Sequence, residues 1–482
     1  MLNIFNNKKM IDAKKFYING EWITPTNSET IDVINPANEK VFTSIGSGCV
    51  NDINKAVDAA KEAFKIYSKT EIDERIILLK KIYKIYKKRY EEIAQTICLE
   101  MGCPIQLSRN AQTKVGLNHL KTAINLLNDY KFEFKENNYI IQQIPIGVCG
   151  LITPWNWPIN QIMSKLVFVL ASGCTCILKP SEISPLSAIL IAEIIDEAGT
   201  PRGVFNLVNG FGSIVGDAMS RHTEISMMSF TGSTIGGISV AKSSADTVKR
   251  VSQELGGKSA NIILDDSSFE KSVKQGVKKC MENSGQSCNA PTRMLVPFRR
   301  LEESFFIAKS VCNSLIVGNP QNEDTDVGPL ANVKQYKKVK DLIHTGINDG
   351  AKIITGGSNR PKNIDSGYYI EPTVFAYVTE EMSIFKEEIF GPVLTITHYH
   401  DYEHALDIAN NTDYGLAAYV SGFEKKDLLK LSKRLNAGQV YINYSSGGTE
   451  APFGGLKMSG NGREKGRWGL NEFLETKAII GE

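Results

Sequence analysis

A cysteine between two small polar residues is the side chain in this chain best suited to covalent chemistry. Cys288 lies in the stretch 282–289 (ENSGQSCN), which follows a predicted helix over 269–282. A thiol is a strong nucleophile only as thiolate, and a helix end, backbone amides or a nearby cation can lower its pKa. The glycine in the turn would let a substrate approach the sulfur closely. The alternative is a buried structural cysteine, the common fate of a free thiol.

Two carboxylates could assist such a nucleophile. Glu254 follows a predicted strand over 248–252 and precedes two glycines. A partly desolvated carboxylate can act as a general base near neutral pH, whereas the alternative is a surface glutamate in a turn. The stretch 387–392 (EEIFGP) presents Glu388 beside Phe390, either in a ligand-binding turn or in an ordinary capped loop.

Short apolar runs that alternate with helical patterns must position these residues. This alternation predicts a parallel sheet with helices on both faces, and a second α/β series runs from 260 to about 444. In the first series the predicted strands are 148–152, 174–178, 204–208 and 225–230, and the predicted helices are 159–171, 186–198 and 214–220.

Three of these predicted strands end in polar motifs, namely 153–158 (TPWNWP), 179–182 (KPSE) and 231–234 (TGST). Parallel sheets bind ligands at the carboxyl ends of their strands. A lysine and a glutamate three residues apart suit ribose hydroxyls and phosphate, and the free amides of a helix start suit a phosphate. Together the motifs predict a nucleotide site.

Two further patterns are weaker. The stretch 210–216 (GFGSIVG) resembles a dinucleotide fingerprint but is one residue too long before its last glycine. It is either the phosphate loop or the wall beside it. His398, His400 and His404 could gather a metal, but no further ligand cluster is evident, so we expect no metal site.

Composition restricts the class of protein. The chain has 482 residues, a net charge of +2 and 42% hydrophobic residues, which predicts a soluble globular protein of two or three domains. Without a basic stripe interleaved with aromatic residues, nucleic acid is not an expected partner. The nine cysteines lack disulfide-like or zinc-like spacing, residues 1–15 show no secretory signal, and the longest apolar run, 166–178, is too short for a bilayer. These features predict a cytoplasmic protein without membrane contact.

The order of the motifs along the chain resembles that of the NAD(P)-dependent aldehyde dehydrogenase superfamily, in its hydrolytic, non-acylating branch. The resemblance covers nearly the whole chain and rests on 154–158, 179–182, 230–234, 254–258, 285–288, 388–392 and 452–455.

The resemblance implies an α/β fold in three parts. A Rossmann-like NAD(P)-binding domain is expected over 1–131 and 149–256, and an α/β catalytic domain over 257–450. A small β oligomerisation ribbon over 132–148 and 465–482 would pair the segment near 139–145 with 473–480. Members of this family are usually dimers or tetramers, so we expect a homodimer or homotetramer.

It also implies roles for individual residues. Cys288 would attack the aldehyde, Asn156 would stabilise the oxyanion and Glu254 would activate water to hydrolyse a thioester. NAD is the expected cofactor because Glu182 would repel a 2′-phosphate, although Lys179 and Ser181 leave NADP open. The expected cofactor-binding residues are Ile152, Thr153, Pro154, Trp155, Lys179, Ser181, Glu182, Gly212, Phe230, Gly232, Ser233, Leu255, Gln335, Lys338, Glu388 and Phe390.

The substrate is an aldehyde whose identity the motifs leave open. By motif alignment, Ser164, Glu282 and Gly447 replace aromatic residues of relatives, and 445–448 (SSGG) is small, so a roomy polar mouth is expected. Glu282 would face a cationic aldehyde or pair with a neighbouring lysine. No arginine is evident for a carboxylate-bearing aldehyde. The expected substrate-binding residues are Trp157, Gln161, Glu282, Ser287 and Gly447.

Two other functions stay open beside hydrolytic oxidation. One is a coenzyme-A-acylating dehydrogenase, which the presence of Glu254 disfavours because acylating branches lack that base. The other is a catalytically silent relative that binds ligands or has a structural role, which intact Cys288, Glu254 and Asn156 disfavour.

Overall fold

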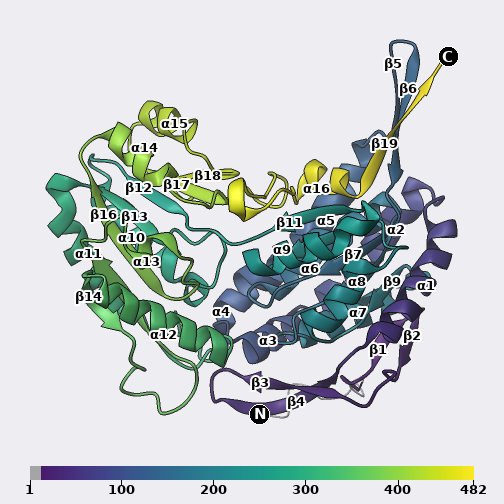
Figure 1. Ribbon diagram of the computed structural model, residues 1–482, viewed down its shortest axis with the longest axis horizontal. Coiled ribbons are helices and arrows are strands. Elements are labelled where there is room, and N and C mark those ends of the chain that lie inside the picture. The colour runs from purple at the N-terminus through teal and green to yellow at the C-terminus, as the bar shows by residue number, and fades with distance from the viewer. Residues whose placement is uncertain (1–11, 482) are drawn as a thin grey trace.

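Two seven-stranded sheets with helices packed on them form the body of the molecule (Figure 1). The computed structural model describes residues 12–481. Most of the segment 1–15, on which the expected absence of a secretory signal rests, therefore lies outside the described residues, as does Glu482.

The first sheet has the strand order β11-β10-β7-β8-β9-β1-β2. Strands β7 to β11 run parallel, and β1 joins β9 antiparallel. The three strands that end in polar motifs, β10, β7 and β8, are direct neighbours, as their common motif chemistry suggests. The strands are β1 (Phe16–Ile18), β2 (Glu21–Ile23), β7 (Val148–Ile152), β8 (Thr175–Lys179), β9 (Phe205–Leu207), β10 (Met227–Thr231) and β11 (Arg250–Glu254).

Helices cover this sheet, and the predicted βα alternation is confirmed. Helix α6 is almost entirely buried, which explains why its sequence is apolar on every side. The predicted helix over 214–220 is instead a π-helical turn, Gly212–Gly216, followed by α8. The helices are α1 (Val50–Tyr67), α2 (Ile72–Lys88), α3 (Tyr90–Met101), α4 (Ile105–Leu107), α5 (Lys114–Asp129), α6 (Pro158–Ser172), α7 (Leu186–Glu197), α8 (Asp217–Arg221) and α9 (Thr234–Ser244).

The second sheet has the order β14-β15-β16-β13-β12-β17-β18, and all its pairs are parallel except β14 with β15. Its strands are β12 (Ala260–Ile263), β13 (Arg293–Pro297), β14 (Lys352–Gly357), β15 (Glu371–Ala376), β16 (Val393–Tyr399), β17 (Ala417–Ser421) and β18 (Gln439–Ile442). Its helices are α10 (Phe269–Met281), α11 (Leu301–Ser314), α12 (Val333–Asn348), α13 (Ser383–Lys386), α14 (Tyr402–Asn410) and α15 (Lys425–Ser432).

The carboxyl edge of the first sheet meets the amino edge of the second. Glu254 is the last residue of β11, whereas Cys288 precedes β13 and Glu388 precedes β16. The backbone N–H of Gly257 donates to Glu388 Oε1 over 2.8 Å, so the turn before β16 touches the chain that leaves β11. Residues 453–464 then return to this junction, where Gly460 forms a β-bridge with Glu254.

A third, three-stranded sheet stands away from the body (Figure 1). The expected pairing of 139–145 with the C-terminal strand is present, with Leu474 opposite Pro145 and Ile480 opposite Tyr139. Its strands are β5 (Glu133–Glu136), β6 (Tyr139–Pro145) and β19 (Leu474–Ile480), which follows α16 (Gly466–Glu472). A separate antiparallel pair, β3 (Thr30–Asn35) and β4 (Lys40–Gly46), lies near the N-terminus.

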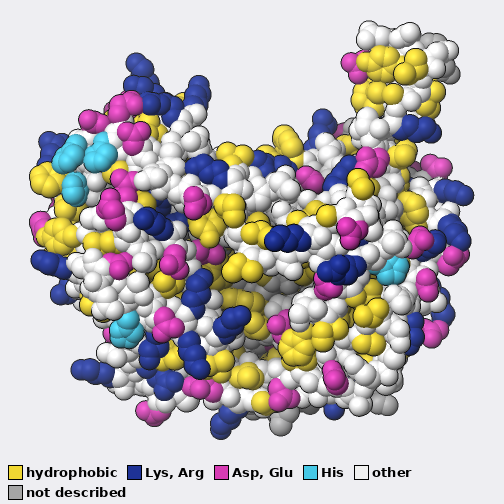
Figure 2. Space-filling view, viewed as in Figure 1, with side chains coloured by type: hydrophobic (Ala, Val, Ile, Leu, Met, Phe, Trp, Pro, Cys, Tyr) yellow, Lys and Arg dark blue, Asp and Glu magenta, His cyan; other side chains and the backbone are white. Residues whose placement is uncertain are grey.

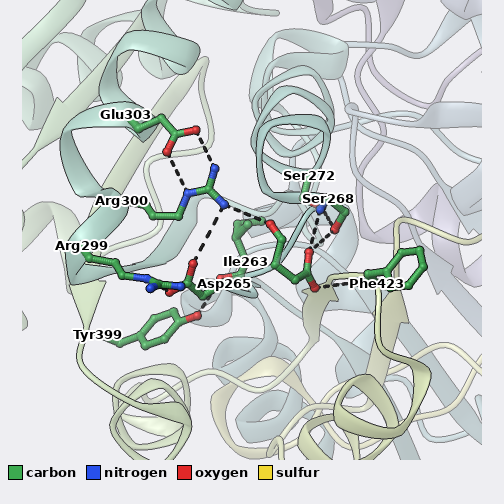
Figure 3. Close-up of polar contacts among 10 residues, drawn as sticks. Ile263, Asp265, Ser268, Ser272, Arg299, Arg300, Glu303, Tyr399 and Phe423 are labelled. Carbon is green, nitrogen blue, oxygen red and sulfur yellow. Dashed lines mark hydrogen bonds and ion pairs between the residues drawn. The ribbon is translucent and has the colours of Figure 1, made fainter.

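The carboxyl end of β12 carries two aspartates whose oxygens are already engaged by protein groups (Figure 3). Asp266 accepts hydrogen bonds from Ser268 N and Oγ and from Phe423 N, at 2.8, 2.7 and 2.6 Å. Asp265 forms an ion pair with Arg299. The neighbouring Arg300 donates two hydrogen bonds, from Nε and Nη2, to the carboxylate of Glu303 in α11. This network joins β12, α11 and the loop after β17, so it is a structural contact.

Charged side chains of both signs are interspersed over the visible face (Figure 2). Histidines gather on the lobe that carries β16 and α14, where the rings of His398 and His400 and those of His400 and His404 lie 5.3 Å apart. Within residues 12–481 no group of three or more histidine, cysteine, aspartate or glutamate side chains could hold a metal ion. Over the same residues, no helix is long and apolar enough to cross a membrane.

Candidate active site

The loop that carries Cys288 is held in a strained conformation. Asn283, Ser284 and Gly285 have φ values of 56°, 57° and 71°, and two of them are not glycine. Left-handed backbone costs an ordinary residue roughly 1–2 kcal/mol. The buried Asn283 side chain offsets this cost, since its Nδ2 donates to the carbonyl oxygens of Asn156 and Gln286 over 3.0 and 3.2 Å.

Gly285 is fixed by close contact as well as by its positive φ. A Cβ at this position would lie 1.9 Å from the carbonyl oxygen of Gly391, in the turn before β16. Gly285→Ala should therefore displace the nucleophile loop, lower turnover at least about tenfold and destabilise the fold by roughly 1–3 kcal/mol beyond the φ cost. Thermal unfolding and initial rates measure both effects.

Gly199 provides the matched control for that substitution. Its φ is 72°, and a Cβ there would meet no atom of residues 12–481 within 4 Å. Gly199→Ala has the same backbone cost without the clash and should keep full activity. Equal losses of activity in the two variants would show that left-handed strain, and not contact with the Gly391 turn, explains the effect.

Asn156 and Trp157 connect the end of β7 to the Cys288 loop. Asn156 is 3% exposed, and its Nδ2 donates to the carbonyl oxygen of Gln286 over 3.0 Å. The Trp157 indole Nε1 donates to Ser287 Oγ over 2.8 Å. The structure thus brings together two motifs that the sequence placed on different sheets, and an amide donor is bonded to the loop that carries the thiol.

Cys288 opens into a cavity of about 290 Å³. All five expected substrate-binding residues, Trp157, Gln161, Glu282, Ser287 and Gly447, line it, and the small stretch 445–448 forms part of its wall. The expectation for Ser164 is wrong: this residue is 1% exposed and its Oγ donates to Glu464 Oε2 over 2.9 Å, away from the cavity.

Aromatic rings that the sequence analysis missed line the same cavity. They are Tyr419, Tyr441, Tyr444 and Phe453. Tyr419 and Tyr441 stack at 4.8 Å from the neighbouring strands β17 and β18. The predicted roomy polar mouth is therefore correct for one wall only. Phe453 belongs to the quoted 452–455 motif, which is the signal that could have identified it.

Burial and nearby carboxylates keep the Cys288 thiol protonated in this structure. Burial, reinforced by the carboxylates of Glu388 and Glu254, raises the pKa of Cys288 to about 12, and the Lys465 ammonium opposes that shift. A pKa lowered by its surroundings, which the loop sequence suggested, is not found. The thiol needs a proton acceptor before it can react.

Glu254 is a buried carboxyl group suited to take a proton from water. It is 2% exposed, and neither side-chain oxygen has a hydrogen-bond partner within residues 12–481. Burial, followed by the Glu464 carboxylate, holds the pKa of Glu254 well above that of an ordinary glutamate. The surface alternative for Glu254 is therefore excluded, and its pKa has moved in the direction that suits a general base.

Behind Glu254 lies a buried ion pair that sequence reasoning missed. Lys165 Nζ contacts Glu464 Oε1, and both side chains are at most 8% exposed. Lys165 comes from α6 and Glu464 from the returning segment 453–464. The pair acts electrostatically on Glu254 and joins groups nearly 300 residues apart in sequence, which no local motif could connect.

The expected ribose-binding residues form a turn at the end of β8. Lys179 Nζ lies 3.5 Å from Glu182 Oε2 and donates to the Pro180 carbonyl over 2.7 Å. Burial lowers the pKa of Lys179, and Glu182 raises it. Ser181 Oγ accepts from the N–H of Ile183 over 3.2 Å.

A second group of expected cofactor residues surrounds the turn before β16. The ring of Phe390 meets that of Trp155 edge-on at 5.5 Å. Gln335 Nε2 donates to the carbonyls of Ile389 and Phe390, both over 2.9 Å, and Lys338 Nζ donates to that of Glu388 over 2.7 Å. Gln335 and Lys338 therefore brace the turn from α12.

The strand ends between these groups carry buried hydroxyls without a partner among residues 12–481. The buried hydroxyls of Thr153 and Thr231 have no hydrogen-bond partner in the described chain, and they follow or end the neighbouring strands β7 and β10. Ser233 caps α9, its Oγ accepting from Gly236 N over 3.2 Å.

Apolar expected residues form the floor below these strand ends. Ile152, Phe230 and Leu255 belong to one hydrophobic cluster, and Phe230 packs beneath Gly232. Pro154 follows Thr153 directly, and Gly212 starts the π-helical turn. The 210–216 stretch therefore begins a helix after β9, beside the β7 and β10 ends.

A profile of the aldehyde dehydrogenase family matches residues 22–479. The chain belongs to the aldehyde dehydrogenase family. It is 49% identical over 473 residues to a 3-succinoylsemialdehyde-pyridine dehydrogenase from a Pseudomonas species, covering 98% of this chain and 99% of that protein.

Solved aldehyde dehydrogenases share the fold closely. A cysteine-to-alanine mutant of aldehyde dehydrogenase C from Pseudomonas syringae, in complex with NAD+ and octanal, has a TM-score of 0.97 and 47% identity, and the match covers 97% of both chains. A betaine aldehyde dehydrogenase from Staphylococcus aureus, with NAD+ and a BME-modified cysteine, has a TM-score of 0.94 and 34% identity over 97% of this chain and 96% of that one.

Proposed function

We propose that this aldehyde dehydrogenase oxidises an aldehyde to the carboxylic acid with NAD, through a thioester on Cys288. The observation that carries the proposal is the Cys288 thiol in the wall of a cavity, with the Asn156 amide bonded to its loop and a buried Glu254, without a protein partner in the described residues, near enough to raise its pKa. The relative from Pseudomonas syringae, studied with NAD+ and octanal, supports both the cofactor and the substrate class.

In the first step the Cys288 thiol releases its proton to water, its Sγ bonds to the carbonyl carbon, and the π electron pair of the carbonyl moves to the oxygen, where negative charge develops. The Asn156 side-chain amide and the Cys288 backbone N–H donate to that oxygen. One such donor typically lowers the barrier by ~2.7–4 kcal/mol. The hydrogen bond from Asn156 to the Gln286 carbonyl orients the amide before substrate arrives.

NAD, when bound, supplies the hydride acceptor for the oxidation. The chain's own groups fit it: unpartnered buried hydroxyls at the ends of β7 and β10, a Lys-Glu pair at the end of β8, and a braced turn with Glu388 and Phe390. Lys179 and Glu182 hold the adenosine ribose, Trp155, Gly232 and Ser233 the middle of the cofactor, and Glu388 and Phe390 the nicotinamide ribose.

Glu254 completes the cycle by taking a proton from water, which then attacks the thioester carbonyl and releases the acid. A positioned base contributes roughly 10²–10⁴-fold. This residue favours water over coenzyme A as acyl acceptor. NAD is preferred over NADP because the Glu182 carboxylate, 33% exposed beside Lys179, would repel a 2′-phosphate.

We also propose the three-part division expected from the sequence, with residues 12–131 and 149–256 binding cofactor, 257–450 carrying the nucleophile and the β5-β6-β19 sheet joining subunits. Its edge strands β5 and β19 are largely exposed, with Ile480 at 79%. Exposed edges of this kind pair readily with another chain. Sedimentation analysis should find a dimer or tetramer, and a monomer would contradict this. The nine free cysteines support a reducing, cytoplasmic location.

The proposed activity is tested by absorbance of NADH with purified protein, NAD and a panel of aldehydes without coenzyme A. The panel contains acetaldehyde, hexanal, benzaldehyde, succinate semialdehyde, 4-aminobutanal and betaine aldehyde. We expect turnover with at least one of them. Silence with both NAD and NADP, but activity after addition of coenzyme A, would identify an acylating enzyme. Silence in every combination would identify an inactive relative.

A further inference from the structure

Lys465 presents an ammonium group without a carboxylate partner to the cavity that contains the nucleophile. The side chain lines the same cavity as Cys288, and its Nζ lies 4.7 Å from the centre of the Phe453 ring. Within residues 12–481 no carboxylate oxygen lies within 4.0 Å of this nitrogen. The proposed catalytic steps do not use Lys465.

The other two charged side chains that line the cavity compensate each other, whereas the carboxyl groups of Glu254 and Glu388 act on Cys288 from outside this lining. Lys279 and Glu282 both line it, and Lys279 Nζ donates to the two Glu282 oxygens over 2.9 and 3.0 Å. The Glu464 carboxylate is engaged by Lys165 and by Ser164 Oγ. Lys465 is therefore the surplus charge, and it is positive.

Backbone geometry holds Lys465 in place. Its φ is 71°, a left-handed value that a lysine rarely adopts. Its neighbour Glu464 is bridged to Phe453 by two backbone hydrogen bonds of 2.7 and 2.9 Å, and Lys465 O accepts from Gly469 N over 2.9 Å. Strained residues of this kind persist where the surroundings over-determine them, and they cluster at ligand sites.

The surroundings leave this cation incompletely stabilised. Burial lowers the pKa of Lys465, while Glu464, Cys288 and Glu254 raise it. Burial, followed by the Lys465 charge, also lowers the pKa of the nearby His119 to about 4, so this imidazole stays neutral at pH 7. A desolvated cation without a paired anion costs free energy, which an anionic ligand in the cavity would recover.

We propose that Lys465 is a specificity-determining residue that binds a carboxylate on the substrate, so that this enzyme prefers semialdehydes over neutral or cationic aldehydes. The inference rests on the proposed function. One expectation from the sequence was that Glu282 faces a cationic aldehyde. The structure disfavours this, because Glu282 is already paired with Lys279. Lys465 also provides the positive charge that a carboxylate-bearing aldehyde needs, for which no arginine is evident in the sequence.

The test compares alkylation of Cys288 by iodoacetate and by iodoacetamide in the free enzyme, followed by peptide mass spectrometry. The reagents have similar size and differ by one negative charge, and the same thiolate attacks both and displaces iodide. Their rate ratio therefore cancels any effect of Lys465 on the pKa of the thiol. Lys465→Met should lower the iodoacetate-to-iodoacetamide ratio about tenfold, the effect of one charged hydrogen bond. An unchanged ratio would overturn the proposal.

Two variants guard this result against a folding artefact. Lys465→Arg retains the positive charge and should keep the wild-type ratio. Lys274→Met removes an exposed lysine that pairs with Glu270 on α10, and should change the ratio less than twofold. A fall in all three variants would show that the ratio reports general damage, and the proposal would be lost.

Turnover gives a second readout. For succinate semialdehyde, Lys465→Met should raise KM about tenfold with little change in kcat, whereas KM for pentanal should stay the same. A shifted alkylation ratio without oxidation of any aldehyde would retain the anion site and reject the proposed function. Oxidation of aldehydes with an unchanged alkylation ratio and an unchanged KM would retain the proposed function and reject the anion site.

Discussion

Replacing Cys288 by alanine is expected to lower NADH production by about 10⁴- to 10⁶-fold, the scale on which loss of a nucleophile acts in covalent catalysis. The variant retains the cavity and the Asn156 amide, but no sulfur can bond to the carbonyl carbon. The measurement is steady-state absorbance at the NADH band with the best aldehyde of the panel.

Cys280→Ala is the matched control, because this cysteine lies in α10 with 0% exposure and outside the cavity. It should cost stability through lost packing and keep turnover near that of the wild type. If the Cys288 variant continued to turn over, the oxidation could not proceed through a thioester at this residue.

Glu254→Gln should separate the two halves of the reaction. The first half forms NADH and the thioester, so a burst of about one NADH per active site is expected. Hydrolysis should then slow by roughly 10²–10⁴-fold because the water has lost its base. Stopped-flow absorbance measures the burst amplitude, and intact-protein mass spectrometry should detect the acyl group on Cys288.

The pH dependence provides the internal control for this prediction. A base acts only when deprotonated, and burial with Glu464 raises the pKa of Glu254. Wild-type steady-state turnover should therefore increase as pH rises through that raised pKa, above the range of an ordinary glutamate. The Gln variant should lack this increase. Steady turnover equal to that of the wild type, with the same pH profile, would remove Glu254 from the role of base.

Sequence patterns were sufficient to place a motif where its polar residues come directly after a strand. The ends of β7, β8 and β10 carry their motifs within a few residues, so their positions at one edge of the sheet followed from βα alternation. The contact between Asn156 and the Cys288 loop joins the motif after β7 to the segment that precedes β13. Local order along the chain therefore predicted the placement of Asn156 and of the 179–182 turn at the end of their strands, and their roles stay predictions.

Groups paired over long sequence separations could not be predicted in the same way. Lys165 and Glu464 meet only because the segment 453–464 returns to the first sheet. Lys465 enters the cavity through the same return. The sequence offered Glu282 either a cationic aldehyde or a neighbouring lysine, and the position of Lys279 identifies the lysine as its partner. Burial of the thiol, which sets its pKa, is likewise a property of the folded chain.

The return of residues 453–464 to the first sheet determines how late in its synthesis the enzyme becomes active. During synthesis the chain emerges from its amino end, and both sheets are available before this segment has left the ribosome. Phe453 and Lys465 are then still missing from the pocket. In a nascent chain the pocket around Cys288 is therefore incomplete. The enzyme becomes active only after the final stretch has been synthesised and has folded back, so that activity depends on completed assembly.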